Sequence, residues 1–279
     1  MAYTKEEFKQ LVDDIQGQSW YKNPIGFGIA KVDRGQINKD KILQATFPLI
    51  NWNENFGSAA VLLNALKVAG VDVDTSKSEL VCKISDEFLT SCIEAFRPFI
   101  PEAKGDAHKN VQVISTLASL PIDSGLSADD YRVVFIFEDV TPESTEAVYL
   151  KLYALSTGKA ALRSLNLTGA FGKLHNCAWV GNQPIELDWL RANEIVLKLS
   201  GKYPNIDMVD KFPRFLQHII PADNTRILET SKVRMGAQLA AGTTVMPGAA
   251  YVNFNAGTLG AVMVEGRISS SAVVGAGSD

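Results

Sequence analysis

The strongest constraint on the fold is a six-residue repeat that runs from residue 233 to the end of the sequence. The first position of each hexad is apolar in most repeats, and the fourth position is small. The first positions are Val233, Leu239, Val245, Tyr251, Gly257, Met263 and Ser269, and the fourth positions are Gly236, Gly242, Gly248, Phe254, Gly260, Gly266 and Ala272. This pattern is typical of a parallel β-helix, in which the leading side chain points inward and the small residue allows a tight turn. A flexible tail rich in glycine and alanine would not keep the period, so the sequence predicts a hexapeptide-repeat solenoid.

Composition describes a globular chain and excludes several classes of function. The sequence of 279 residues is 46% hydrophobic and 21% charged, which is enough for a sizeable core. Its net charge of −4 argues against a nucleic-acid-binding surface, which needs a surplus of basic residues. The N-terminal residues are acidic and amphipathic, unlike a signal peptide, and no apolar run approaches the about 18 residues that span a bilayer. Three widely spaced cysteines, Cys82, Cys92 and Cys177, fit reduced thiols, so we expect a cytoplasmic protein.

The residues before the repeat alternate between helical and strand patterns. Apolar spacing and capping residues predict helices at 4–16, 53–70, 85–96, 144–155 and 185–199, and β-rich runs predict strands at 25–35, 111–117 and 132–138. Gly26 and Gly28 lie in the first of these strands and lack the third glycine of a dinucleotide-binding loop. We expect three parts: an N-terminal α/β domain over 1–140, a middle α/β segment over 141–220, and a left-handed parallel β-helix over 221–279.

No familiar catalytic motif stands in the sequence. There is no Ser-His-Asp order, no HExxH motif and no Walker loop. Of the three histidines, His108 lies in a polar run and is expected to be solvated, whereas His175 and His218 lie in apolar surroundings and are expected to be structural. The histidines are scattered and have no close-spaced partners, so they predict no metal site.

Three motifs carry a resemblance to a known family. In chain order they are DKFPR at residues 210–214, VNFNAGT at 252–258 and MVEGRIS at 263–269. Together they resemble the tetrahydrodipicolinate N-succinyltransferases, in the longer form found in actinobacteria and pseudomonads. The resemblance runs from about Ser144 to the last residue, and residues 1–140 resemble only the variable N-terminal domain of that family. Hexapeptide β-helices are commonly trimeric acyltransferases, which agrees at the level of fold.

The resemblance implies transfer of a succinyl group from succinyl-CoA to the amine of ring-opened tetrahydrodipicolinate (L-2-amino-6-oxopimelate), a step towards diaminopimelate and lysine. Glu265 matches the catalytic carboxylate of the family, either as the base that takes the amine proton or as the group that accepts the acyl as an anhydride. Arg267 matches a residue that contacts the acyl-CoA or the substrate carboxylates. The other binding candidates, from motif position and charge, are Ser269, Asn253, Asn255, Lys211 and Arg214. The resemblance also implies a homotrimer.

Two features depart from the family pattern. Relatives carry acidic residues that hold a magnesium ion between subunits, whereas Ser231 and the segment 246–249 stand at the corresponding positions. We therefore expect no metal and no cofactor, with succinyl-CoA as co-substrate. The repeat also ends early, because residues 221–279 hold only about three coils of about 18 residues each. We expect a C-terminally truncated chain whose β-helix is incomplete and lacks part of the CoA site.

Two other functions stay open. The same solenoid could serve only to trimerise the N-terminal domain, or it could belong to a hexapeptide acyltransferase with another acyl donor or acceptor. On spacing alone, Glu265 and Arg267 would be interpreted as a solvated ion pair on a β-helix face. The motif around them favours the enzyme, since a bare scaffold would need neither side chain. The role of residues 1–140 is left open.

Overall fold

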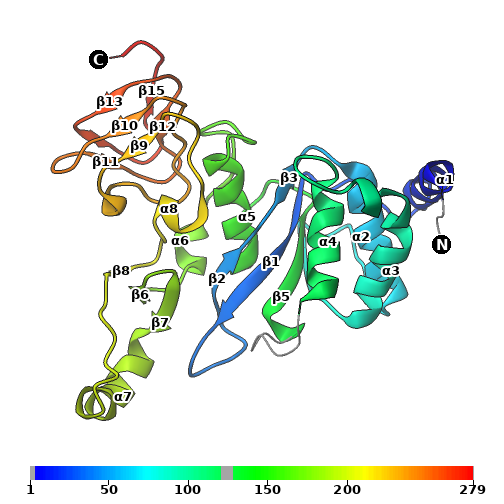
Figure 1. The fold of residues 1–279 in the computed structure, drawn as a ribbon, viewed down its shortest axis with the longest axis horizontal. Helices are drawn as coiled ribbons and strands as arrows, with labels where there is room; N and C mark the ends of the chain where they lie inside the picture. The colour runs from blue at the N-terminus through cyan, green and yellow to red at the C-terminus, as the bar shows by residue number, and fades with distance from the viewer. Residues whose placement is uncertain (1–3, 121–127, 279) are drawn as a thin grey trace. The chain divides into compact units, whose positions relative to one another are not determined.

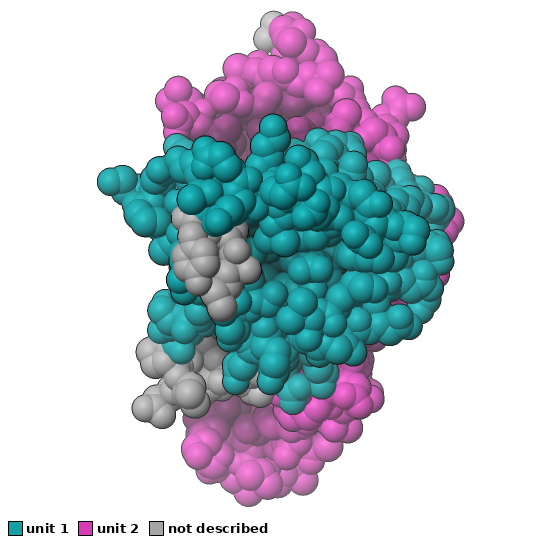
Figure 2. Space-filling view, turned by 90° about the vertical axis from the view of Figure 1, so that its right-hand side faces the viewer, with its two compact units in different colours: residues 1–32, 47–140 teal, residues 33–46, 141–279 magenta. Residues whose placement is uncertain are grey.

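The structure is a computed structural model that describes residues 4–120 and 128–278; residue 279, the end of the predicted repeat, lies outside the described residues. The chain divides into two compact units, which Figure 2 colours separately. Unit 1 comprises residues 1–32 and 47–140, and unit 2 comprises residues 33–46 and 141–279. Within the described ranges, no helix has the length and apolar character needed to cross a membrane.

Unit 1 is an antiparallel sheet with helices packed against it. β5 (Tyr131–Ile136) pairs with β1 (Gly26–Arg34) and with β4 (Glu79–Lys83), and β3 (Ile50–Trp52) pairs with the first residues of β1. The helices are α1 (Lys5–Gln16), α2 (Phe56–Val68), α3 (Asp86–Phe96) and α4 (Lys109–Ser119), with 3-10 turns η1 (Arg97–Glu102) and η3 (Ala128–Asp130). Helices α2, α3 and α4 lie on one side of the sheet (Figure 1). The apolar side chains between them form one core.

Local sequence determines where these helices begin and end. The hydroxyl of Thr4 accepts a hydrogen bond from the backbone N–H of Glu7, and the Glu7 carboxylate accepts one from the backbone N–H of Thr4, so a capping box opens α1. Ser85 caps α3 by accepting from the N–H of Phe88. Gly70 follows α2 with a φ of 79°, the left-handed conformation that commonly ends a helix. These features confirm the three helices predicted in this part of the chain.

The predicted strand at residues 111–117 is wrong, because this segment lies within α4. Val111 and Ile114 are buried in the core of unit 1, and Val113 and Leu117 pack against that core. Spacings of three and four residues bring such side chains to one side of a helix. Here that spacing outweighs the preference of β-branched residues for strands. The other predicted strand, at 132–138, is confirmed as β5, which is buried along most of its length.

The two strand glycines have a packing reason. A Cβ atom on Gly26 would lie 2.5 Å from the ring of Trp52 on β3. A Cβ atom on Gly28 would lie 2.8 Å from the carbonyl oxygen of Leu49. Both distances are shorter than a van der Waals contact, so the close approach of β1 to β3 requires residues without side chains. The glycine pair therefore belongs to a strand, as predicted, and not to a nucleotide-binding loop.

The middle part of unit 2 contains a small antiparallel sheet. Its central strand β6 (Cys177–Val180) pairs with β7 (Gln183–Glu186) and with β8 (Met208–Asp210). β2 (Ile42–Thr46) supplies Leu43 to an apolar cluster with Cys177 and Trp179. Glu186 holds the segment before β2 in place, because its carboxylate accepts from the N–H of Ile37 at 2.7 Å and pairs with Lys41 at 2.9 Å. Residues 33–46 therefore pack with unit 2, although the sequence assigns them to the N-terminal domain.

Three further helices of unit 2 stand before, within and after this sheet in chain order. They are α6 (Ala170–Lys173), α7 (Leu187–Leu199) and α8 (Phe215–His218). The helix predicted at 185–199 begins at Leu187, because the residues before it pair with β6 as β7. β7 is an edge strand, where Pro184 is tolerated because edge positions need not donate to a ladder.

Helix α5 (Thr145–Ser156) is buried on every side. Ser144 caps its first turn as predicted, by accepting from the N–H of Ala147 at 3.0 Å. Even Lys151 is only 1% exposed, and its ammonium group donates to the carbonyl oxygen of Asn166 at 2.8 Å. The predicted apolar stripe is thus only part of a helix that is enclosed all round.

His218, the last residue of α8, lies in a polar network inside unit 2. Its Nδ1 is 2.8 Å from the hydroxyl of Tyr153, and its Nε2 is 2.9 Å from Oε1 of Gln44. Burial lowers the pKa of His218 to about 4, against a smaller opposing effect of Asp33. The imidazole is therefore neutral at pH 7 and joins two parts of unit 2, in keeping with the structural role that the sequence predicts.

The buried imidazole predicts a pH-dependent stability. Unfolded histidine titrates near pH 6.5 and folded His218 near pH 4, so the unfolded chain binds the proton more readily and stability falls as the pH drops through this window. The loss attributable to His218 is about 3 kcal/mol. H218Q keeps polar atoms at this position without a titratable group, so it should lack this loss. Urea unfolding of both proteins at pH 7 and pH 4.5 measures the difference; an identical pH dependence would refute it.

The C-terminal part of unit 2 consists of stacked coils of parallel strands (Figure 1). Face A contains β9 (Arg226–Ile227), β10 (Thr244–Val245) and β13 (Met263–Val264). Face B contains Val233, β11 (Tyr251–Val252) and β14 (Arg267–Ile268). Face C contains Gln238, β12 (Gly257–Thr258) and β15 (Val273–Val274). A 3-10 turn, η4 (Thr230–Lys232), precedes the first residue of face B. These pairings agree with the three-sided coil that the repeat predicts.

The predicted inward column is correct only up to Val245. After it the second residue of the strand is buried in β11 to β14, at Val252, Thr258, Val264 and Ile268, whereas Met263, which the strict period points inward, is 53% exposed. The corner at residues 246–250 contains one residue more than the period requires, which shifts the following hexads by one position. The corner at residues 265–266 contains two residues fewer. Corners can change length without breaking the stack, because only the strands must stay in register.

Candidate active site

Face B carries two columns of outward side chains. Val233, Val252 and Ile268 are its buried residues in successive coils. Because side chains alternate along a strand, the neighbours of these three point outward. One column is Lys232, Tyr251 and Arg267, and the other is Arg234, Asn253 and Ser269. The repeat therefore brings three predicted site residues, Asn253, Arg267 and Ser269, to the same face.

A cluster of two arginines and one aspartate lies beside the first coil of face B. Nη1 of Arg214 donates to Oδ2 of Asp210 at 3.0 Å. Nε and Nη2 of Arg234 donate to the same oxygen at 3.1 Å and 2.9 Å. Nη1 of Arg234 also donates to Oδ1 of Asn253 at 3.3 Å. This bond joins the cluster to the column of face B that contains Asn253 and Ser269. We call these residues, Asp210, Arg214 and Arg234, the arginine cluster.

Aromatic rings hold the Arg234 guanidinium in place. Its central carbon lies 5.4 Å from the ring centroid of Phe212 and 5.9 Å from that of Tyr251, and both distances are within reach of a cation–π interaction. Phe212 in turn stacks on Phe254 with their centroids 4.7 Å apart. The DKFPR and VNFNAGT motifs, which are far apart in sequence, are thus in direct contact.

Lys211 points away from the arginine cluster. Its ammonium group donates to the carbonyl oxygen of Phe171 at 2.9 Å and lies 4.4 Å from the centroid of the Phe171 ring. His175 is influenced by the same amine: burial lowers the pKa of His175, and the charges of Lys41 and Lys211 lower it further. Lys211 therefore contributes positive charge to this region, while its direct contacts are with Phe171.

Glu265 stands at the corner between β13 and β14, where face A turns into face B. Its side chain is exposed, and so is that of Arg267 at the start of β14. Within the described residues, no hydrogen bond or ion pair involves either of these side chains. The pair is therefore not the surface ion pair that its spacing suggests. An exposed carboxylate at the corner between two strands, two residues before an exposed arginine, is free to contact a ligand.

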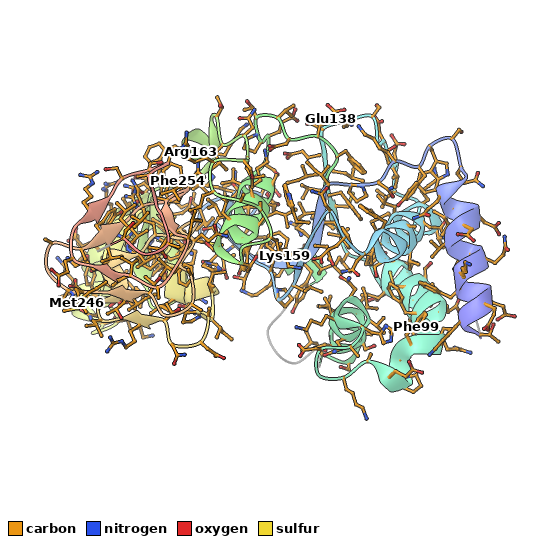
Figure 3. The ribbon with its side chains drawn as sticks, turned by 90° about the horizontal axis from the view of Figure 1, so that it is seen from above. Phe99, Glu138, Lys159, Arg163, Met246 and Phe254 are labelled. Atoms are coloured by element: carbon orange, nitrogen blue, oxygen red, sulfur yellow. The ribbon has the colours of Figure 1, made fainter. Side chains whose placement is uncertain are left out.

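Asn255 has a structural environment, unlike its neighbour Asn253. It is 8% exposed and has a φ of 54°, the left-handed conformation that asparagine tolerates better than most residues. Its Oδ1 accepts from the N–H of Arg163 at 2.8 Å, and its Nδ2 donates to the hydroxyl of Ser271 at 3.2 Å. Figure 3 shows Arg163 beside Phe254. Met246 lies apart from both, at a different corner of the coils. The side chain of Asn255 thus holds a loop against the coils.

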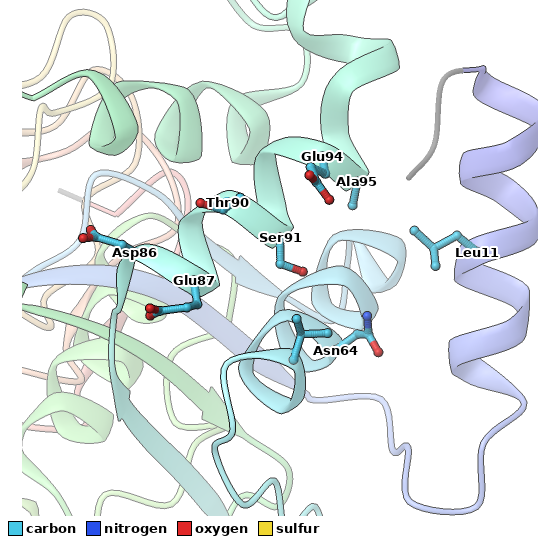
Figure 4. A pocket seen from close by; sticks show the side chains of 9 residues that line it. Leu11, Asn64, Asp86, Glu87, Thr90, Ser91, Glu94 and Ala95 are labelled. Carbon is cyan, nitrogen blue, oxygen red and sulfur yellow. The ribbon is translucent and has the colours of Figure 1, made fainter.

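A hollow in unit 1 is chemically unsuited to the predicted substrate. It has a volume of about 530 Å³ and lies between α1, α2 and α3 (Figure 4). Its described lining includes the carboxylates of Asp86, Glu87 and Glu94 and no basic side chain. A dicarboxylate would be repelled there. A second hollow of about 470 Å³, in unit 2 beside face C, has no charged side chain in its lining. Face B is the part of the described structure that combines a free carboxylate with several guanidinium groups.

Sequence reasoning missed Arg234, which links Asp210 to Asn253 on face B. It lies in the hexapeptide run, but outside the three motifs, and nothing in its local sequence marks it. A basic residue two positions after Lys232 is ordinary for the outer face of a strand. Among the described residues, no group of three or more His, Cys, Asp or Glu side chains is arranged as a metal site.

Comparison with known proteins identifies the family. The N-terminal model of the tetrahydrodipicolinate N-succinyltransferases matches residues 6–172, and the middle model of the same family matches residues 174–214. Together these matches cover well over half of the chain, so the chain belongs to the tetrahydrodipicolinate N-succinyltransferase family. The first match also shows that the resemblance covers residues 6–140, where the sequence motifs do not reveal it.

Individual relatives agree. A 2,3,4,5-tetrahydropyridine-2,6-dicarboxylate N-succinyltransferase from a Sulfurovum species is 67% identical over 274 residues, which are 98% of this chain and 68% of the relative. One from Pseudomonas aeruginosa is 43% identical over 142 residues, which are 51% of this chain and 41% of the relative. A crystal structure described as a 2,3,4,5-tetrahydropyridine-2-carboxylate N-succinyltransferase from Campylobacter jejuni matches with a TM-score of 0.94 and 57% identity. The match covers 100% of this chain and 71% of that one.

Proposed function

We propose that this chain transfers a succinyl group from succinyl-CoA to the amine of ring-opened tetrahydrodipicolinate, in the route to diaminopimelate and lysine. The observation that carries the proposal is the free carboxylate of Glu265 on the rim of face B, beside Arg267 and in a member of this family. A protein that only assembles its N-terminal domain would need neither side chain. An acyltransferase with another donor would not need so many guanidinium groups, which suit dicarboxylate recognition.

The reaction needs a base and a means of holding two anionic substrates. The amine nitrogen of the acceptor attacks the thioester carbonyl carbon, a C–N bond forms, the C–S bond breaks, and CoA leaves as a thiolate. The attacking amine must lose one proton, which Glu265 accepts if it acts as the base. In the alternative, the Glu265 carboxylate attacks first, expels the CoA thiolate and forms an anhydride that the amine then opens. Arg267 and Ser269 bind the acyl-CoA or the acceptor in either case.

The proposal includes an architecture and an assembly. Residues 221–279 form a left-handed parallel β-helix, residues 141–220 form a middle segment, and residues 1–140 form an N-terminal domain. Three copies associate through the β-helix, in the cytoplasm, and no metal ion is required. The three-sided coil and its exposed polar columns support the β-helix. Sedimentation of the purified protein tests the trimer, and a monomer would contradict it.

The decisive experiment is a CoA-release assay. Purified protein is mixed with succinyl-CoA and tetrahydrodipicolinate, and the free thiol is followed with a thiol reagent while the succinylated amine is identified by mass spectrometry. The 279-residue chain is tested alone and with the C-terminal segment of the Campylobacter jejuni relative fused to it. We expect thiol release that depends on the acceptor. Release with acetyl-CoA but not succinyl-CoA would indicate another acyltransferase, and no release from either protein would leave the scaffold interpretation.

A further inference from the structure

The arginine cluster has an excess of positive charge. Oδ2 of Asp210 accepts three N–H groups from the two guanidinium groups. Oδ1 of the same carboxylate accepts the backbone N–H of Lys211 at 2.7 Å and that of Phe212 at 3.4 Å. Both oxygens of the one carboxylate are therefore occupied, while two guanidinium groups share its single negative charge.

This excess is poorly compensated by solvent. The side chains of Asp210, Arg214 and Arg234 are 10%, 15% and 23% exposed. The Nε atom of Arg214 is buried, and no described residue accepts a hydrogen bond from it. Arg214 and Arg234 are also paired across an isolated antiparallel bridge, so like charges occupy facing positions. Burying a charge without a partner is costly, and one further carboxylate would give two negative charges for two positive ones.

We propose that the arginine cluster is a carboxylate-binding subsite of the active site, in which Arg234 and Arg214 bind one carboxylate of a substrate and Asp210 positions them. The inference deepens the proposed function and rests on it. The shared chemistry is a terminal carboxylate, which both the acceptor and the succinyl group of the donor possess.

The surroundings of Arg234 support this role. Rings of Phe212 and Tyr251 lie near its guanidinium group, and Tyr251 pairs with Arg267 in the next coil. The subsite therefore lies on the same face as Arg267 and is continuous with it through Tyr251. Asp210 occupies the Nε–Nη2 edge of Arg234 and Asn253 accepts from Nη1. Each Nη atom carries a second N–H group, and stacking on a ring leaves these in-plane groups available to a carboxylate.

Binding experiments test the subsite without turnover. Isothermal titration calorimetry with pimelate, which has the acceptor's chain length, and with succinate measures Kd for the wild-type protein and for R234M, R214M and R234K. We expect the Kd of at least one dicarboxylate to rise about 30-fold to 100-fold in R234M and R214M. R234K keeps the charge but loses the fork, so its Kd should rise about tenfold. R191M removes an exposed arginine on α7 that pairs with Asp188, and its Kd should stay within about twofold.

Kinetic arms then identify which carboxylate is bound. If the acceptor binds there, R234M raises the KM for tetrahydrodipicolinate about 30-fold and leaves the preference for succinyl-CoA over butyryl-CoA unchanged. If the succinyl group binds there, that preference in kcat/KM falls by a similar factor and the acceptor KM is unchanged. Thermal unfolding tests whether each variant is folded. If R234M does not fold, R234K replaces it in these measurements. Unchanged Kd values for both dicarboxylates in folded R234K and R214M would overturn the subsite. A protein that binds pimelate normally but transfers no succinyl group would instead overturn the proposed function alone.

Discussion

Replacing Glu265 with glutamine is expected to lower the kcat of succinyl transfer by about 10²-fold to 10⁴-fold. Glutamine has nearly the same size, and the corner residue is exposed without partners in the described structure, so the fold should not change. The amide can neither accept the amine proton nor attack the thioester, so either form of the reaction loses its essential step. The KM for succinyl-CoA should stay within about threefold, because binding does not need the carboxylate. Steady-state thiol release measures both constants.

The matched control for this variant is E194Q. Glu194 pairs with Lys198 at 2.6 Å on the surface of α7, and its loss should leave kcat unchanged because exposed pairs contribute little. If the kcat of E265Q equalled that of E194Q, Glu265 would have no role in the mechanism. Mass spectrometry of the wild-type protein incubated with succinyl-CoA alone separates the two roles. A succinyl adduct on Glu265 indicates the anhydride, whereas an unmodified protein that still turns over favours the base.

Replacing Gly257 with alanine is expected to destabilise the coils by about 3 kcal/mol. Gly257 lies on face C, directly beside Gln238 of the preceding coil. A Cβ atom at this position would overlap the carbonyl oxygen and carbonyl carbon of Gln238, which are backbone atoms and cannot rotate away. The strands would have to separate, and their parallel hydrogen bonds would weaken. Urea unfolding followed by far-UV circular dichroism measures the change.

The control here is G172A. Gly172 lies in α6, and a Cβ atom there would meet no other atom within 4 Å. Alanine should be neutral or slightly stabilising at such a helical position. Unfolding midpoints for G257A and G172A that coincide would show that the coils can separate without cost. Loss of the parallel register in G257A would also reduce transfer, since Glu265 and Arg267 are placed by the coils.

The repeat predicts the coils because every hexad makes the same local demand. It does not predict which residue faces inward beyond Val245, because one corner is lengthened by a single residue and the alternation of a strand turns that change into a change of side. Met263, assigned to the interior, is exposed for this reason. The strand predicted at 111–117 is wrong for a different reason. Val111 and Ile114 have a helical spacing, and the packing of α4 against the core makes this segment a helix.

The candidate site was predictable to the extent that motifs mark it. Glu265, Arg267 and Ser269 come from one motif, and the structure places Glu265 at the corner before face B and Arg267 and Ser269 on either side of the buried Ile268. Arg234 could not be found in this manner, because its partners Asp210 and Asn253 are distant in sequence and meet it only when the coils stack. The reverse holds for Asn255. It lies in a motif and is therefore predicted as a binding residue, but its contacts with Arg163 and Ser271 are those of a structural residue.

The short corner after Val264 limits how this protein can be redesigned. Only Glu265 and Gly266 connect β13 to β14, and a Cβ atom on Gly266 would meet no other atom within 4 Å, so packing at Gly266 does not demand the shortening. Inserting two residues there would make the repeat regular, and the strands could stack as before. The inserted loop would nevertheless carry the carboxylate of Glu265 away from the rim of face B. A solenoid with a fully regular repeat would therefore still fold into stacked coils, but it would not catalyse the proposed succinyl transfer.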